Sequence, residues 1–219
     1  MNQAVHRPNT RPEWPSPRFL SLEDGQRLLH LLCHQRDGGT VVQLVAATRG
    51  EGTSSLVRDL ALAAIRLAGT RVLLLDLDPP GNRQLAALGR DFGLPSEAYT
   101  TVKGVSGEAT MHRLAAGALH VSETLAPPRN VSDWCGHFPA MREQFDLVLI
   151  DSPAADQFYE AIMLAPEVDT SVLVVEAERT RAAVACNLRD RIQDVGGAIA
   201  GVLLNKRRFH VPDIINALI

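Results

Sequence analysis

Residues 41–69 read VVQLVAATRGEGTSSLVRDLALAAIRLAG, and this stretch decides the fold. It begins with an apolar run at 41–46, which is typical of a buried strand, and ends with a segment at 56–69 that is typical of a helix. Between them lies a glycine-containing turn, AATRGEGTSS at 46–55. The stretch therefore predicts a strand, a tight loop and a helix in direct succession.

The turn has the pattern of a phosphate-binding P-loop, with one departure. Such a loop reads G-x-x-x-x-G-K-[ST]: its backbone amides surround the phosphates, and its lysine reaches the β and γ oxygens. Here Gly52 and Ser54 stand in the places of the second glycine and the hydroxyl residue, but Thr53 replaces the lysine. We therefore expect a loop that keeps the shape of a P-loop and lacks its central positive charge.

Further apolar runs occur at 72–78, 145–151, 170–177 and 199–205, and helix-like segments separate them. Near-continuous apolar runs indicate strands buried on both faces, and their alternation with helices indicates a parallel sheet with right-handed crossovers. The predicted fold is a doubly wound α/β domain with a mainly parallel sheet, of the P-loop NTPase type. Between 95 and 141 the sequence predicts only short helices and a weak strand near 118–122.

The chain divides into an arm and one domain. Its 219 residues, of which 46% are hydrophobic, suffice for a single core. Residues 1–20 are predicted to be a flexible arm because they are rich in arginine and in proline, namely Pro8, Pro12, Pro15 and Pro17. The domain is expected to occupy 21–219, beginning with a helix capped by Ser21.

Composition excludes several classes of protein. A formal charge of -3 gives no bulk reason to expect a nucleic-acid partner. The three cysteines, Cys33, Cys135 and Cys186, are odd in number and widely spaced, which argues against a disulfide framework or a zinc site. No apolar run reaches the roughly 18 residues that span a bilayer. We expect a cytoplasmic protein that reaches the inner membrane only peripherally, through a partner or a surface helix.

Acidic residues follow two of the predicted strands. Asp76 and Asp78 lie at the end of one run, and Asp151 ends another. In a parallel sheet the carboxyl ends of the strands meet at one edge, where ligands bind. Carboxylate and hydroxyl oxygens are ligands that Mg²⁺ prefers, so these acids and Ser54 predict a magnesium site beside the loop.

From Val41 to Asn205 the sequence resembles the cytoplasmic P-loop domain of the bacterial tyrosine kinases of capsule and exopolysaccharide export, a branch of the ParA/MinD-type ATPases. The matching motifs are listed here in chain order: RGEGTSS at 49–55 against P-G-E-G-K-S-T, VLLLDLD at 72–78, FDLVLIDSP at 145–153, VDTSVLVVEAERTR at 168–181 and GVLLNK at 201–206. Thr48 stands where ParA and MinD proteins carry a second lysine, so the kinase branch is the better match.

The resemblance implies a site for ATP or ADP with Mg²⁺. The residues that would contact the nucleotide are Arg49, Gly50, Glu51, Gly52, Thr53, Ser54 and Ser55 at the phosphates, and Asn205 near the adenine. Ser54, Asp76 and Asp151 would hold the magnesium, and Asp76, Asp78 and Asp151 would serve catalysis in vestigial or weak form. The resemblance also implies a partner, a membrane-embedded polysaccharide co-polymerase that regulates chain length.

The departures from the family concern charge and substrate. Lys103 and Lys206 are the chain's two lysines, and neither is near the loop in sequence, although Arg49 could reach a phosphate. Family kinases phosphorylate a C-terminal tyrosine cluster, whereas the tyrosines here are Tyr99 and Tyr159. The ring-forming pattern E-x-x-R-x-x-R is represented by DGQRLLH at 24–30, which keeps one residue of three. A ring is therefore not expected, and a homodimer stays open.

The stretch 206–219 combines basic residues with an apolar pattern. Basic residues precede Pro212, and apolar residues with helical spacing follow it, namely Ile214, Ile215, Leu218 and Ile219. This pattern fits a helix that binds a membrane surface or a partner. It also fits a helix that packs on its own sheet.

Three functional hypotheses follow. The first is a catalytically impaired domain of the kinase type that regulates or scaffolds polysaccharide polymerisation and export. The second is an active ATPase or tyrosine autokinase of the same pathway that tolerates Thr53, so whether the chain is an enzyme depends on a nucleotide assay. The third is a ParA/MinD-like positioning ATPase, which Thr48 and the acidic balance disfavour.

Overall fold

The computed structural model describes residues 14–33, 38–77, 83–93, 99–103, 110–114, 118–122 and 136–207. The helical elements are α1 (Leu22–Leu32), α2 (Thr53–Ala68), α3 (Arg83–Phe92), α5 (Phe138–Gln144), α6 (Glu160–Met163), the 3-10 turn η2 (Ala165–Glu167) and α7 (Ala182–Asp194). The strands are β1 (Thr40–Ala46), β2 (Val72–Asp76), β3 (Tyr99–Lys103), β4 (Thr110–Leu114), β5 (Leu119–Ser122), β6 (Leu147–Asp151), β7 (Thr170–Glu176) and β8 (Ile199–Asn205).

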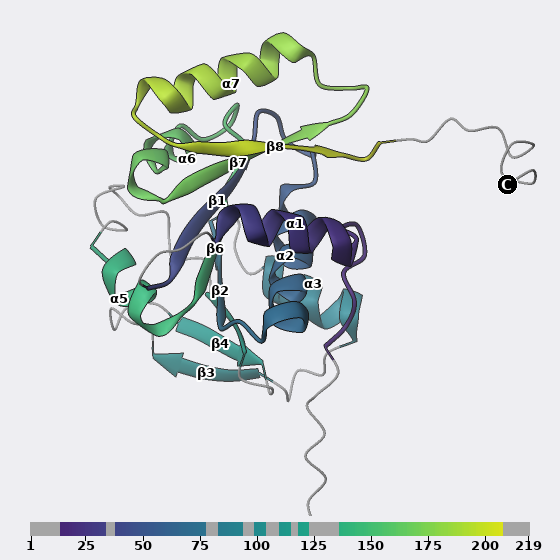
Figure 1. Ribbon diagram of the computed structural model, residues 1–219, viewed down its shortest axis with the longest axis vertical. Coiled ribbons are helices and arrows are strands. Elements are labelled where there is room, and N and C mark those ends of the chain that lie inside the picture. The colour runs from purple at the N-terminus through teal and green to yellow at the C-terminus, as the bar shows by residue number, and fades with distance from the viewer. Residues whose placement is uncertain are drawn as a thin grey trace, which may run out of the picture.

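The strands form one sheet at the centre of the molecule (Figure 1). Within the described residues it has eight strands, in the order β3-β4-β5-β2-β6-β1-β7-β8. The six strands from β5 to β8 run parallel, and β4 pairs with both β3 and β5 in antiparallel fashion. The predicted doubly wound, mainly parallel α/β fold is confirmed.

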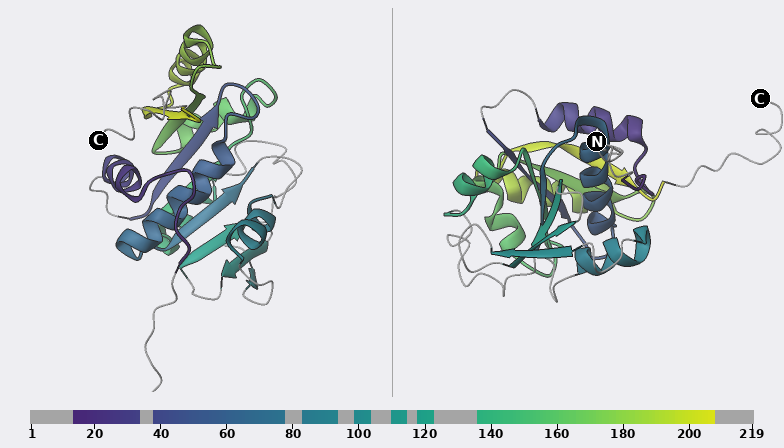
Figure 2. Two further views of the ribbon diagram at one scale, coloured as in Figure 1. Left: turned by 90° about the vertical axis from the view of Figure 1, so that its right-hand side faces the viewer. Right: turned by 90° about the horizontal axis from the view of Figure 1, so that it is seen from below.

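Helices cover both faces of the sheet (Figure 2). On one face, α1, α2 and α3 pack against residues such as Val42 and Leu44 of β1. On the other face, α5 packs near Val41, while α6 and α7 pack near Val45. Because side chains alternate along a strand, a strand that is covered on both sides must be apolar throughout, which is why β1 reads as a continuous apolar run.

The strands that the sequence analysis missed are β3 and β4 at one edge of the sheet. Their sequences, YTTVK and TMHRL, mix polar and apolar residues and lack an apolar run. The strand predicted near 118–122 is confirmed as β5. The cap predicted at Ser21 is also confirmed, since the Ser21 hydroxyl accepts a hydrogen bond from the backbone amide of Asp24 at 3.0 Å.

The arm predicted over 1–20 needs correction at its C-terminal part. Residues 1–13 lie outside the described residues, but residues 14–20 lie against α2 and α3. The buried Asp59 carboxylate of α2 accepts hydrogen bonds from the backbone amides of Phe19 and Leu20, the latter at 2.9 Å. The Arg66 side chain donates to the Trp14 carbonyl. Composition missed this segment because its anchoring uses backbone amides.

Three further predictions fall wholly or partly outside the described residues: the role of Asp78, the surroundings of Cys135, and the segment 206–219, of which Lys206 and Arg207 alone are described. Among the helices that the structure describes, none is both long enough and apolar enough to cross a membrane.

Candidate functional site

The glycine-rich loop joins the end of β1 to the start of α2, at the edge of the sheet where the parallel strands end. Gly50 and Gly52 have φ angles of 91° and 96°, in the left-handed region that glycine adopts without strain. Gly52 is the N-cap of α2, and Thr53 is its first residue. The first amides of a helix have no acceptor within the helix, and its dipole favours an anion there, so this end of α2 is suited to a phosphate.

Glu51 holds the loop in shape from within. Its side chain is buried, and its carboxylate accepts hydrogen bonds from the backbone amides of Ala47 at 3.1 Å and Thr48 at 3.3 Å. The Thr180 hydroxyl donates to the same carboxylate. Glu51, predicted at the nucleotide phosphates, thus has its carboxylate engaged by the protein itself.

The end of β8 holds the loop from outside. The Asn205 amide donates to the Glu51 carbonyl at 2.7 Å, and the Lys206 ammonium donates to the Gly50 carbonyl at 2.6 Å. A Cβ atom on Gly52 would lie 2.2 Å from the Asn205 amide nitrogen, so a larger residue at 52 would collide with this contact. Sequence reasoning missed Lys206 because more than 150 residues separate it from Gly50.

Lys206 also binds Glu176 at the end of β7, with its ammonium 3.1 Å from the carboxylate. This hydrogen bond, with the nearby charges of Lys206 and Arg179, lowers the pKa of Glu176. The loop, β7 and β8 are thus joined at one point by a single lysine.

A hollow of about 190 Å³ lies beside the loop. Its volume is below the range of about 300–1,000 Å³ that is usual for pockets enclosing a whole small ligand. It is lined by Ala46, Thr48, Arg49, Gly50, Gly52, Thr53, Ser54, Ser55, Arg83, Ser152, Ala154 and Gln157. Among the described residues, its cationic side chains are Arg49 and Arg83, and no lysine lines it. Arg83, at the start of α3, is a second cation that sequence reasoning missed.

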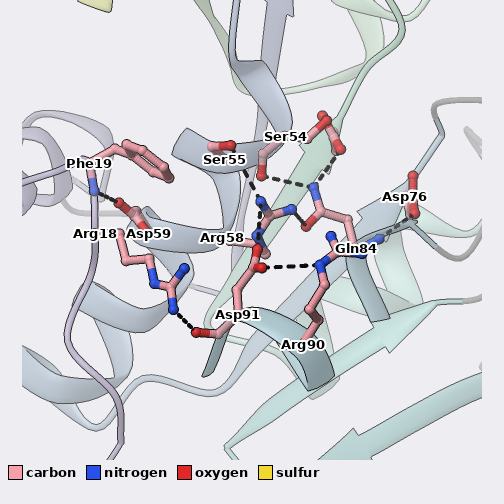
Figure 3. Close-up of polar contacts among 11 residues, drawn as sticks. Arg18, Phe19, Ser54, Ser55, Arg58, Asp59, Asp76, Gln84, Arg90 and Asp91 are labelled. Carbon is pink, nitrogen blue, oxygen red and sulfur yellow. Dashed lines mark hydrogen bonds and ion pairs between the residues drawn. The ribbon is translucent and has the colours of Figure 1, made fainter. Parts of the chain in front are cut away.

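The two acids lie side by side at the same edge of the sheet. Asp76 of β2 pairs in register with Asp151 of β6, and both are fully buried. Gln84 of α3, also fully buried, contacts both acids and the loop (Figure 3). Its side-chain nitrogen donates to Asp151 Oδ2 at 2.5 Å and to the Ser54 carbonyl at 3.0 Å. Its backbone amide donates to Asp76 Oδ2 at 3.0 Å.

Arg58 of α2 lies behind Gln84. It is buried, and its guanidinium donates to the side-chain oxygen of Gln84 at 2.9 Å and to the Ser55 hydroxyl at 3.3 Å. Burial lowers the pKa of Arg58, while the nearby carboxylates, chiefly Asp151, act in the opposite direction. A signal for Arg58 was available, since it interrupts an apolar helix one turn after Ser54. Nothing in the sequence marks Gln84.

Known proteins support this description. No protein-family model matches the sequence. The EpsB protein of Ralstonia nicotianae, whose name places it among the tyrosine-protein kinases, is 28% identical over 177 residues, or 78% of this chain and 23% of EpsB. The tyrosine-protein kinase CpsD of Streptococcus agalactiae is 24% identical over 76% of this chain and 75% of CpsD. The predicted resemblance to bacterial tyrosine kinases is confirmed.

The likeness extends to solved structures. The kinase domain of VpsO superposes with a TM-score of 0.65 at 23% identity, covering 83% of this chain and 92% of that domain. The septum-site protein MinD of Pyrococcus horikoshii, solved with Mg-ADP, superposes with a TM-score of 0.60 at 16% identity, covering 82% of this chain and 77% of MinD. At such identities the likeness shows the fold, which is that of the P-loop NTPases.

The resemblance to tyrosine kinases implies Mg²⁺ at Ser54, Asp76 and Asp151, and the arrangement does not fit it. Ser54 and both acids do lie together, as predicted. However, the Gln84 amide nitrogen is 2.5 Å from Asp151 Oδ2, and a second Gln84 donor engages Asp76. Among the described residues, no group of three or more His, Cys, Asp or Glu side chains is placed to hold a metal.

Proposed function

We propose that the chain is a catalytically impaired P-loop domain of the bacterial tyrosine kinase type, which regulates or scaffolds exopolysaccharide polymerisation and export. The observation that carries the proposal is Thr53, which takes the place of the phosphate-binding lysine at the first position of α2. The relatives that are named kinases support the type of domain. The matched region spans 23% of EpsB, so activity and partners are proposed for this chain on its own.

The missing charge weakens both binding and chemistry. A charge-assisted hydrogen bond contributes about 1.5–3 kcal/mol, so its loss weakens nucleotide binding by about tenfold or more. Phosphoryl transfer depends almost wholly on positioning and charge neutralisation, so the transition state loses more than the ground state. ATP or ADP, if bound, would place its phosphates at residues 49–55 and its adenine near Asn205.

The proposed partner is a membrane polysaccharide co-polymerase. The proposal rests on the resemblance, because domains of this type act with such a protein, and on the basic and apolar pattern of 206–219. Through this partner the chain would lie at the cytoplasmic side of the inner membrane. We propose no nucleic-acid partner, and we leave a homodimer open.

Nucleotide titration tests the proposal. We expect Mg-ATP and Mg-ADP to bind weakly or undetectably by isothermal titration, and phosphate release to stay at background. The control is Asp151→Ala, which removes an acid that the chemistry would need. Phosphate release that is clearly above background, and that disappears in Asp151→Ala, contradicts the proposal.

One observation favours the second candidate, an active ATPase or tyrosine autokinase. Lys206 contacts the loop through Gly50, and Arg83 lines the hollow, so cations absent from the motif are present in space. If either replaced the missing lysine, Lys206→Met or Arg83→Met would abolish phosphate release that the unmodified protein shows. The same assay therefore separates the two candidates.

A further inference from the structure

We propose that the side-chain amide of Gln84 takes the place of a divalent cation between the acids and the loop, so that the site is closed without metal. The inference deepens the proposed function and rests on it only in that both describe an impaired site. Its test uses metal alone, so it can fail while the nucleotide assay still succeeds, and the reverse also holds.

The contacts of Gln84 are those that a bridging cation would make. Its side-chain nitrogen has two hydrogens, and the two acceptors within reach are Asp151 Oδ2 and the Ser54 carbonyl. Its backbone amide serves Asp76. One residue therefore links β2, β6 and the start of α2, and its side chain is fully buried.

An amide is neutral, and the positive charge comes from Arg58. The guanidinium donates to the Gln84 side-chain oxygen at 2.9 Å, and the amide nitrogen of the same side chain donates to Asp151. Hydrogen bonds in such a series polarise one another, so the cation acts on Asp151 through the amide. Arg58 is itself held by the Ser55 hydroxyl and lies 3.8 Å from the Asp91 carboxylate.

Metal and amide exclude each other at this position. Mg²⁺ binds its oxygen ligands at about 2.0–2.1 Å and demands near-octahedral geometry. The Gln84 nitrogen lies 2.5 Å from Asp151 Oδ2, so a cation at that oxygen must displace the amide. Displacement would break the contacts of Gln84 with Asp151 and Ser54 in a buried site, where an unsatisfied polar group is costly.

The test compares metal binding by the unmodified protein and by Gln84→Ala, with Mg²⁺ or Mn²⁺ as the only ligand. We expect no saturable Mn²⁺ binding to the unmodified protein by electron paramagnetic resonance, and no change in its thermal midpoint. We expect Gln84→Ala to have a lower midpoint without metal and to bind Mn²⁺. At about a hundred times the Kd, metal should raise the midpoint of this variant by about 5–10 °C.

Gln43→Ala is the matched control. Gln43 is also a fully buried glutamine, and its side-chain nitrogen donates to the Ser152 hydroxyl at 2.8 Å and to the Ala161 carbonyl at 2.6 Å. It lies away from the acids, so its removal should lower the midpoint without creating metal sensitivity. Should Gln84→Ala fail to fold, Gln84→Asn keeps the amide on a side chain one methylene shorter and should show the same gain.

Two results overturn the inference. One is saturable Mn²⁺ binding by the unmodified protein with the same affinity as the variant, because the amide would then not exclude the metal. The other is a folded Gln84→Ala or Gln84→Asn whose midpoint and resonance spectrum ignore the metal. Neither result bears on phosphate release, which tests the proposed function separately.

Discussion

At the scale of single residues, Thr53 is the change with the clearest chemical meaning. It is buried at the wall of the hollow, at the start of α2. We predict that Thr53→Lys raises the affinity for ATP by about 1–3 kcal/mol, because the loop, Ser54 and the helix terminus are in place and lack only the charge. Isothermal titration measures this gain.

Thr53→Met is the control for this substitution, since it adds a long side chain without a charge and should gain nothing. An unchanged affinity in Thr53→Lys would mean that the charge cannot reach a phosphate from this position. If the gain is absent until Gln84 is also replaced, the closed metal site, and not the missing lysine, limits nucleotide binding.

A second prediction at this scale concerns acid stability. The Arg71 side chain donates hydrogen bonds to the Asp146 carboxylate, one of them at 2.6 Å, and these bonds lower the pKa of Asp146. A carboxyl whose pKa is lower in the folded state contributes stability above its unfolded pKa, and this contribution is lost as pH falls through the folded pKa. The unfolded value is about 3.9, so the loss occurs below about pH 4.

Asp146→Asn should therefore be less stable than the unmodified protein at pH 5–8, with the difference shrinking below about pH 4. Urea unfolding at a series of pH values measures it. The pair is about half exposed, so we expect a small difference. A difference that stays constant down to pH 2 would contradict the assignment.

At the scale of elements, the loop and the end of β8 depend on each other. Gly52 needs a left-handed φ and also has no room for a Cβ atom beside Asn205. Gly69, at the other end of α2, has a φ of 65° but nothing within 4 Å of its Cβ position. We predict that Gly52→Ala loses more stability than Gly69→Ala, which should lose about 1 kcal/mol from backbone strain alone.

Chemical denaturation of the two variants tests this difference, and amide hydrogen exchange locates it. In Gly52→Ala, exchange should accelerate at residues 49–55 and at the end of β8, whereas in Gly69→Ala it should accelerate at the end of α2. Equal losses in the two variants would mean that the Asn205 contact does not constrain the loop.

Elements also explain how far the sequence could be read. The parallel strands were predictable because burial on both faces makes each of them apolar throughout. Strands β3 and β4 were not, because edge strands keep polar residues and their pairing depends on partners far along the chain. The acids and the loop were predictable from strand ends, whereas Gln84 and Lys206 reach the site only through folding.

At the scale of the whole molecule, the segment 206–219 poses the main question. Lys206 and Arg207 are described, and the rest lies outside the described residues. We predict that deleting Pro212–Ile219 leaves the thermal midpoint nearly unchanged and abolishes co-purification with the co-polymerase or binding to anionic vesicles. The four large apolar residues after Pro212 would each contribute about 1.5–3 kcal/mol if buried in a partner or a membrane surface.

The matched control replaces Ile214, Ile215, Leu218 and Ile219 with serine in the full-length chain, which keeps the length and the basic residues. It should behave like the deletion. A fall of the midpoint by many degrees in either variant would mean that the segment belongs to the core of its own domain, and the interaction hypothesis would then be abandoned.

The contact of Lys206 with Gly50 has a consequence for signalling between two ends of the molecule. Lys206 is a non-glycine residue with a φ of 57°, so its backbone is held in a conformation that it would leave if released. A binder that turns the chain after residue 207 would withdraw the ammonium from Gly50 and slacken the loop. By thermodynamic reciprocity, an anion that fixes the loop would change the grip of that binder by the same factor, so an inactive nucleotide pocket could still serve as a sensor.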